Sequence, residues 1–110
     1  WHNDHSSLTG LVVGQFVNTK TGEFLTKSPD PSAGLYIRSR KGELLKVSLP
    51  ADNEKVHAGN TLLFQIGESS QIHTGGILQA TPHAVRGPDA ANVSRESYAV
   101  FMQPSWNEPM

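Results

Sequence analysis

Short runs of alternating apolar and polar residues, with almost no helical periodicity, fill most of this 110-residue chain. Alternate side chains of a strand face the same side, so such runs predict strands that bury one face. The expected strands span residues 8–16, 34–39, 44–48, 61–66, 77–85 and 95–103. A single short helical turn is expected over residues 68–72. The pattern therefore predicts an all-β fold.

Turn-forming residues separate these runs. Lys41-Gly42 lies between two strand patterns and makes residues 35–48 the clearest hairpin. Further turns are expected at 18–22, 28–32, 50–53 and 87–90. Several short antiparallel strands at this spacing favour a sandwich or jelly roll. Phe64, Val100 and Phe101 are expected in its core, because alternate strand residues must fill the interior.

Composition narrows the class of protein. A net charge of −1 and a pI near 6.6 give no electrostatic footprint for nucleic acid. No apolar run is long enough to span a membrane and no leader pattern is present, so no membrane partner is expected. The chain has no cysteine, which excludes disulfides and thiolate metal sites and fits a reducing, cytoplasmic compartment. Strong metal ligands must therefore be His, Asp or Glu.

The first candidate chemistry lies at His2-Asn3-Asp4. In an extended segment His2 and Asp4 project to the same face and can reach one ion together, while Asn3 points away. A third ligand must come from another strand, and His83 follows Pro82, which favours an extended strand at a mouth or an edge. Two imidazoles and one carboxylate leave other positions open, as in non-haem Fe(II) sites that activate oxygen.

A candidate carboxylate receptor lies further along the chain. Arg95 and Ser97 are two positions apart and would face the same way, and a guanidinium beside a hydroxyl binds carboxylates strongly. The break at 87–90 is expected to let two neighbouring strands carry His83 and this receptor. His5 is expected to face away from Asp4, and His73 to be exposed rather than to line the mouth of the site.

A series of short motifs follows one order through most of the chain. They are His2-Asn3-Asp4 with Leu8-Thr9-Gly10-Leu11, Gly34-Leu35-Tyr36-Ile37, residues 59–68, Thr74-Gly75-Gly76, Ala80-Thr81-Pro82-His83-Ala84-Val85, and Arg95-Glu96-Ser97 with Phe101-Met102-Gln103-Pro104. In this order they resemble the catalytic C-terminal half of the 2-oxoglutarate- and Fe(II)-dependent dioxygenases of the isopenicillin N synthase-like superfamily. The chain departs from that pattern at Glu68, Gly75 and Ala84, where the family usually has Asp, Asn and Arg.

The resemblance implies a specific chemistry. Fe(II) would be bound by His2, Asp4 and His83, and the distal carboxylate of 2-oxoglutarate would be held by Arg95 and Ser97. With dioxygen, such an enzyme hydroxylates or otherwise oxidises a small organic substrate and releases succinate and carbon dioxide. The substrate cannot be identified, because specificity loops vary freely on this scaffold.

The resemblance also implies a fold and a domain arrangement. Residues 1–104 would form the C-terminal part of a double-stranded β-helix, a jelly roll, and residues 105–110 a tail. Because the first ligand follows Trp1 directly, we expect an N-terminal part of the same polypeptide to supply further strands. The interval between the first ligands and His83 is longer than the family pattern leads us to expect, and the extra length is expected between Phe16 and Gly34, as an enlarged loop beside the metal mouth.

Two alternatives stay open. The first is an oxidase that, like isopenicillin N synthase, uses the iron site without 2-oxoglutarate, with Arg95 and Ser97 binding a carboxylate of the substrate. Formation of succinate separates it from the leading hypothesis. The second is a non-enzymatic β-sandwich binding module in which the metal-binding residues are incidental, and it predicts that Asp4→Ala leaves ligand binding unchanged.

Overall fold

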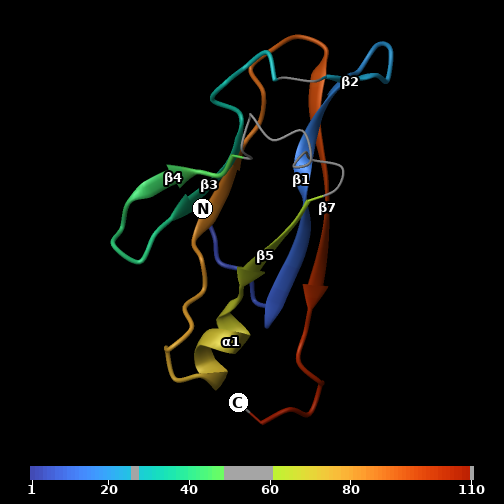
Figure 1. Ribbon diagram of the computed structural model, residues 1–110. Coiled ribbons are helices and arrows are strands. Elements are labelled where there is room, and N and C mark those ends of the chain that lie inside the picture. The colour runs from blue at the N-terminus through green and yellow to red at the C-terminus, as the bar shows by residue number, and fades with distance from the viewer. Residues whose placement is uncertain (26–27, 49–60, 110) are drawn as a thin grey trace.

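Two antiparallel β-sheets make up most of the structure, a computed structural model that describes residues 1–25, 28–48 and 61–109 (Figure 1). In chain order the elements are β1 (Leu8–Asn18), β2 (Phe24–Leu25), β3 (Gly34–Arg38), β4 (Leu44–Lys46), β5 (Leu62–Ile66), α1 (Glu68–His73), β6 (His83–Arg86) and β7 (Val93–Met102). The all-β prediction is confirmed, and α1 forms where the helical turn was expected. Within the described residues, no helix has the length and hydropathy that a membrane crossing requires.

The larger sheet is built around β1. Its first half pairs with β5 and its end with β2, while β7 pairs along its other edge. The β1–β7 register shifts between Val12 and Gln15, where β1 has one residue more than β7. Such a bulge bends the strand and re-aims nearby side chains. The bulge lies beside Gly14, close to the place where Arg95 meets β1.

The smaller sheet has the order β4-β3-β6. The hairpin of β3 and β4 confirms the prediction around Lys41-Gly42, and Gly42 has a φ of 82°, a conformation that glycine adopts without strain. On the other side of β3, Ile37 pairs with His83 of β6. An isolated bridge from His2 to His83 then adds the start of the chain to this sheet.

The predicted strand at 77–85 is too long, because β6 begins only at His83. The backbone before it bonds elsewhere: Ala80 N donates to Gln71 Oε1 at 2.8 Å and Thr81 N to Ile66 O at 3.2 Å. Because these two N–H groups donate to α1 and to the end of β5, they are not available for hydrogen bonds to β3. The predicted turn at 50–53 lies outside the described residues.

A carboxylate fastens the loop before β3 to the loop after β6. Asp30 Oδ1 accepts hydrogen bonds from Ser32 Oγ at 2.6 Å and Ser32 N at 3.0 Å, and its Oδ2 accepts one from Asp89 N at 2.8 Å. These donors, above all the Ser32 hydroxyl, lower the pKa of Asp30 to about 2. The ionised carboxylate therefore stabilises the entry to β3 and the exit from β6 together.

The buried apolar side chains are few and small. Leu11, Ala33, Leu35 and Ala80 are buried, and the first three line the space between the two sheets. Burial of each leucine contributes roughly 1.5–3 kcal/mol relative to exposure. The core therefore sits between β1 and β3.

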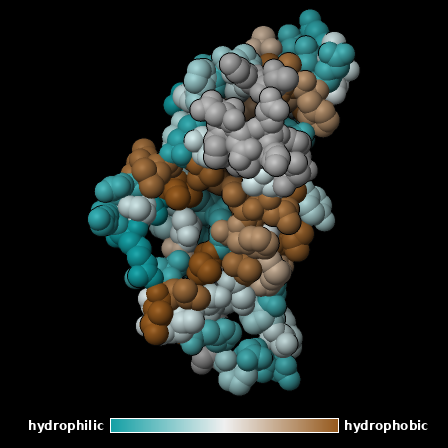
Figure 2. Space-filling view, viewed as in Figure 1, coloured by the Kyte–Doolittle hydropathy of each residue, from teal (hydrophilic) through white to brown (hydrophobic). Residues whose placement is uncertain are grey.

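The expectation that Phe64, Val100 and Phe101 fill the core is wrong, since they are 60, 46 and 55% exposed. Phe64 and Val100 both pair with Gly10, between the buried Thr9 and Leu11, so they lie on the opposite face of the larger sheet. No described element covers that face, and Phe101 lies on β7, at an edge of the sheet. Apolar side chains accordingly gather at the surface over β4 and β5 (Figure 2).

Candidate metal centre

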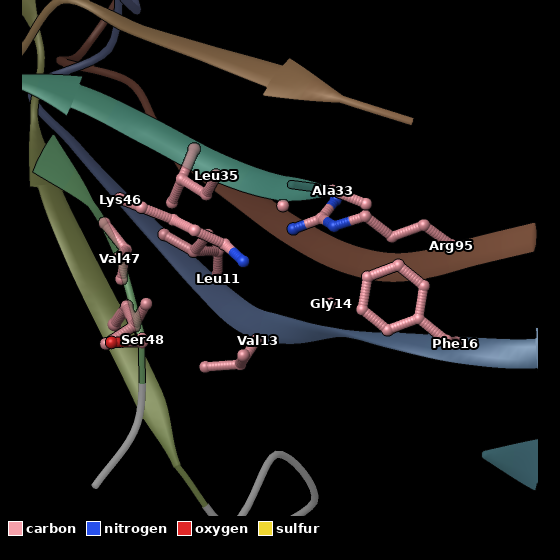
Figure 3. A pocket seen from close by; sticks show the side chains of 12 residues that line it. Leu11, Val13, Gly14, Phe16, Ala33, Leu35, Lys46, Val47, Ser48 and Arg95 are labelled. Carbon is pink, nitrogen blue, oxygen red and sulfur yellow. The ribbon is translucent and has the colours of Figure 1, made fainter. Parts of the chain in front are cut away.

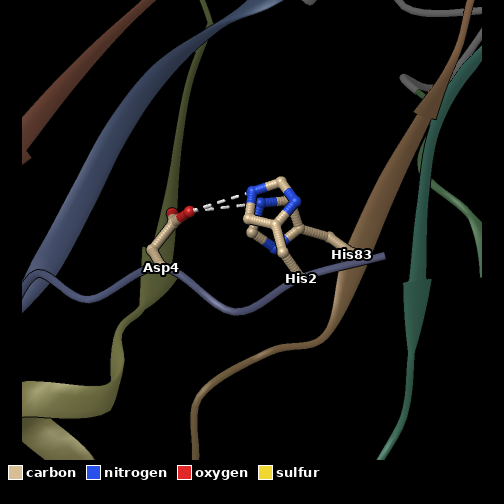
Figure 4. A group of neighbouring side chains, drawn as sticks. All are labelled: His2, Asp4 and His83. Carbon is tan, nitrogen blue, oxygen red and sulfur yellow. Dashed lines mark ion pairs between the residues drawn. The ribbon is translucent and has the colours of Figure 1, made fainter.

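The three predicted metal ligands come together in one cluster. Asp4 Oδ1 lies 3.4 Å from His2 Nε2 and 3.3 Å from His83 Nε2 (Figure 4). One ligand atom from each residue lies within 4.8 Å of the others. The predicted set of His2, Asp4 and His83 is therefore assembled from the start of the chain and from β6.

A backbone bridge places the two imidazoles side by side. His2 N donates to His83 O and His83 N donates to His2 O, each at 3.0 Å. Directly opposed residues of an antiparallel pair project to the same side, and the two ring centroids are 4.2 Å apart. His83 is buried, whereas the side chain of His2 is 62% exposed. The cluster thus has one open side, at His2.

The hydrogen bond made by His83 sets its tautomer. His83 Nδ1 lies 2.9 Å from Thr81 O, and a carbonyl only accepts, so Nδ1 carries the proton. In the neutral ring the lone pair of Nε2 then faces Asp4 Oδ1. A lone pair and a carboxylate oxygen repel unless a cation lies between them, and backbone carbonyls commonly orient metal-ligating histidines in this way. A cation between these two atoms would relieve that repulsion.

The spacing of the donor atoms fits such an ion. Two atoms bound to one ion at about 2.1 Å are ~3.0 Å apart at a right angle and ~3.4 Å apart at a tetrahedral angle. The two separations from Asp4 Oδ1, 3.3 and 3.4 Å, need little or no adjustment to meet that requirement, and all three ligand atoms lie within 4.8 Å of one another. They also exceed the ~2.7–2.9 Å of a direct charge-assisted hydrogen bond. The residues could hold a divalent metal ion.

The Asp4 carboxylate is buried and fixed on its far side. Its side chain is 5% exposed, and Thr9 Oγ1 donates to Oδ2 at 2.7 Å. Thr9 Oγ1 in turn lies 2.8 Å from Ser6 Oγ. Oδ2 is thereby turned away from the imidazoles, and Oδ1 is left to face them.

The start of α1 clamps the segment that carries Asp4. Glu68 N donates to Asp4 O at 2.8 Å, and Ser69 Oγ donates to His5 O at 2.6 Å. Ser70 Oγ donates to Ser7 O at 2.6 Å. Gly67 lies against the same backbone, with no room for a side chain. These bonds fix the backbone at Asp4 and immediately after it.

Glu68 has a local role in the structure. Glu68 Oε1 accepts a hydrogen bond from Asn3 Nδ2 at 3.3 Å. The longer side chain of Glu, compared with Asp, reaches the residue between the two N-terminal ligands. Asn3 thus points away from the ion site, as expected, and helps to hold the segment to α1.

Arg95 lies in a cavity of about 140 Å³ between the two sheets (Figure 3). The lining is mostly apolar, and Lys46 and Arg95 enter it from opposite sides. The Lys46 amine donates to Pro31 O, but no ion pair to Arg95 occurs within residues 1–25, 28–48 and 61–109. Burial lowers the pKa of the Arg95 guanidinium from its ordinary value. A half-buried cation of this kind favours an anionic ligand.

Gly14 makes room for this guanidinium. A Cβ on Gly14 would lie 2.5 Å from Arg95 Nη2 and closer still to its Cζ. The bulge of β1 between Val12 and Gln15 places this glycine opposite β7. Arg95 can therefore lie flat against the backbone of β1.

The cavity begins close to the cluster of His2, Asp4 and His83. Leu11 lines it and lies two residues from Thr9, which bonds to Asp4; Leu35 also lines it and lies two residues from Ile37, the partner of His83. Two residues of a strand span about 7 Å. The cavity and the cluster therefore occupy neighbouring parts of one space between the sheets.

Other parts of the predicted site are not brought together. Ser97 is exposed and does not line the cavity of Arg95. The prediction that neighbouring strands carry His83 and Arg95 is wrong, because β6 belongs to the smaller sheet and β7 to the larger. His5 and His73 are exposed and outside the cluster, in agreement with the prediction.

The described residues of the interval between Phe16 and Gly34, 17–25 and 28–33, do not form the expected loop beside the cluster of His2, Asp4 and His83. Its first turn joins β1 to β2, and β2 pairs with Phe16 and Val17 at the end of β1 remote from Thr9. Because β1 runs on for several residues beyond Thr9, this turn lies ~25 Å or more along the strand from the cluster. Among the described residues of this interval, Ala33 alone lines the cavity.

Supporting residues were missed in the sequence, although two of them left a signal. Thr9 shares a face with the apolar Leu11 in an alternating strand, and a polar residue on a buried face needs a partner. Gly14 interrupts a strand pattern, which commonly marks a bulge or a close approach of another group. Nothing in the local pattern indicates the role of Ser6.

Comparisons with protein-family models, with curated proteins and with solved structures find no match to this chain. The family assignment therefore stays a prediction that is carried by the ordered motifs and by the geometry of the cluster.

Proposed function

We propose that the chain carries the active site of an Fe(II)- and 2-oxoglutarate-dependent oxygenase that acts on a small organic molecule. The observation that carries the proposal is the convergence of two histidines and one buried carboxylate beside a cavity lined by Arg95, an arginine that makes no ion pair with any residue the structure describes. Two nitrogen ligands and one oxygen ligand suit Fe(II) and leave positions for exogenous ligands. Bound iron would supply the oxygen-activating chemistry of the reaction.

The charges of the site favour a dianionic cosubstrate. A divalent ion held by the single carboxylate of Asp4 keeps a net positive charge, which attracts a 2-oxoacid. The Arg95 guanidinium offers paired N–H donors to the distal carboxylate at the other end of the cavity. The apolar lining limits water around the Arg95 guanidinium and so strengthens its attraction to that carboxylate. Arg95 orients the cosubstrate in this proposal, without Ser97.

We also propose that the two sheets belong to a double-stranded β-helix. In support, strands far apart in sequence pair antiparallel: β1 with β5 and β7, and β3 with β6. The ligands and the arginine then come from opposite sheets and converge on the space between them. A double-stranded β-helix is the fold that the resemblance to the isopenicillin N synthase-like superfamily implies.

An anaerobic titration tests the proposed function. Fe(II) is added to the chain, then 2-oxoglutarate, and the visible charge-transfer band of the iron chelate is recorded. We expect a band that His83→Ala abolishes and that His73→Ala, which changes an exposed histidine outside the cluster, leaves intact. A chain without the band, or a band that survives His83→Ala, contradicts the proposal.

Two further measurements separate the alternatives. Oxygen consumption without formation of succinate would favour the oxidase that does not use 2-oxoglutarate, with Arg95 holding a carboxylate of the substrate. Iron affinity that is unchanged by Asp4→Ala would favour the binding module. The structure bears on this choice through Asp4, since a buried carboxylate facing two imidazoles has no evident purpose in a module that binds no cation.

A further inference from the structure

We propose that Ser6 and Thr9 form a one-way hydrogen-bond relay that reserves Oδ2 of Asp4 and confines this carboxylate to binding an ion through Oδ1 alone. The inference rests on the proposed metal site and adds positioning residues to it. Neither hydroxyl touches the ion. Both act through Asp4, by deciding how many of its oxygens can coordinate.

The relay is buried throughout. Ser6 is 0% exposed, Thr9 2% and Asp4 7%, so water does not compete for these hydrogen bonds. Thr9 Oγ1 lies 2.7 Å from Asp4 Oδ2, and Ser6 Oγ lies 2.8 Å from Thr9 Oγ1. These are short, well-made bonds between oxygens.

The direction of donation follows from the chemistry of the groups. An ionised carboxylate only accepts, so the single hydroxyl proton of Thr9 must point to Asp4 Oδ2. Thr9 then has no proton for Ser6, and the bond between the two hydroxyls must be donated by Ser6. The sequence of donors is therefore Ser6 to Thr9 to Asp4, and each bond polarises the next.

The relay makes coordination through both oxygens of Asp4 unfavourable. Turning Oδ2 to the ion would break the bond from Thr9 and leave buried hydroxyls without their partners, which is unfavourable because water cannot replace them. Oδ1, by contrast, faces both imidazoles and accepts no hydrogen bond within the described part of the chain.

The consequence concerns the number of open positions on the ion. One ligand atom from each of the three residues leaves half the positions of an octahedral ion open. A second oxygen from Asp4 would leave only a third of them. Half is what a chelating 2-oxoacid and dioxygen need together, so the relay keeps the site able to bind both.

The test uses Mn(II) alone as a probe. Affinity is measured by titration, and the exchangeable waters on bound Mn(II) are measured by water-proton relaxation. We expect Thr9→Val, which keeps the shape but loses the hydroxyl, to lower the relaxation enhancement per bound ion by about a third. Affinity should fall by about 10- to 100-fold, the usual loss when a partner of a metal ligand is removed. Thr9→Ser restores the hydroxyl and should restore both values.

The outcomes separate this inference from the proposed function. An unchanged relaxation enhancement in Thr9→Val overturns the relay, whatever the affinity. If circular dichroism shows that Thr9→Val does not fold, Ser6→Ala decides: an affinity loss of roughly two- to tenfold supports the relay, and an unchanged affinity overturns it. A parent chain that binds Mn(II) no better than Asp4→Ala overturns the metal site itself, and the proposed function with it.

Discussion

Replacing Gly67 by alanine tests whether α1 holds the metal-ligating segment in place. Gly67 precedes α1, and its backbone runs against that of Ser6 and Asp4. A Cβ at this position would lie 2.7 Å from the carbonyl carbon of Ser6, closer still to its oxygen, and 3.1 Å from Asp4 O. The obstructing atoms are backbone, so no side chain can rotate out of the way.

The size of the effect follows from these distances. Carbon atoms pack at about 3.5–4.0 Å, so the segment must move by at least about 1 Å to admit the methyl group, and the closer carbonyl oxygen of Ser6 demands more. Overpacking of this kind destabilises a fold by about 1–3 kcal/mol. The same movement strains the bond from Glu68 N to Asp4 O, now 2.8 Å, and displaces Asp4 from the imidazoles. Metal affinity should therefore fall together with stability, by about tenfold or more.

Urea unfolding and Mn(II) titration measure the two effects of Gly67→Ala. The matched control is Gly87→Ala, because a Cβ on Gly87 meets no atom within 4 Å. We expect the control to keep the unfolding free energy within about 0.5 kcal/mol and the affinity of the parent. A Gly67→Ala chain as stable as the control and equal to it in Mn(II) affinity would refute the role of α1 as a clamp.

Three further predictions concern the rest of the fold. Gly14→Ala should displace the Arg95 guanidinium and weaken 2-oxoglutarate binding by about tenfold. Titration should show that its Mn(II) affinity is unchanged. A loss of both affinities would contradict separate sites for the cosubstrate and the ion. Asp30, with a pKa lowered from 3.8 to about 2, stabilises the fold above pH 3.8 and loses this contribution as pH falls through 2. Asp30→Asn should therefore reduce the fall in the urea unfolding midpoint as the pH is lowered from 3.8 to about 2. An unchanged pH dependence of the midpoint would contradict this. Leu35→Ala, at a 7% exposed position, should lower the unfolding free energy by about 2–4 kcal/mol, against under 0.5 for Leu62→Ala at 64% exposure.

Local patterns were sufficient to predict most of the strands. Period-two alternation, the turn at Lys41-Gly42 and the helical turn at Glu68 all depend on neighbours in sequence, and all appear where expected. Alternation also divides each strand into two faces, but it does not say whether another element covers a face. Phe64 shows this limit, since its face of the larger sheet is uncovered by any described element.

The cluster of candidate metal ligands was predictable because the chemistry of metal binding is restrictive. Only a few residue types bind divalent ions, and His2, Asp4 and His83 are brought together as expected. The predicted pair of carboxylate-binding residues, Arg95 and Ser97, was harder to place. Arg95 reaches the cavity and Ser97 does not, because the burial of a side chain on an edge strand depends on its tertiary neighbours. The same reason hides the hydroxyl relay and the α1 clamp, which join residues through burial rather than through spacing.

The bridge between His2 and His83 has a consequence for the way the chain stays folded. It joins two segments from almost opposite ends of the sequence, and Asp4 is fastened to α1 beyond β5 of the other sheet. An ion bound there would act as a removable crosslink that closes a very long loop and ties the two sheets together. At a hundred times its dissociation constant such an ion adds about 2.7 kcal/mol to the unfolding free energy. Removal of the ion by a chelator would then weaken the contact between the two sheets. The supply of metal would therefore control how long the chain stays folded as well as its reactivity.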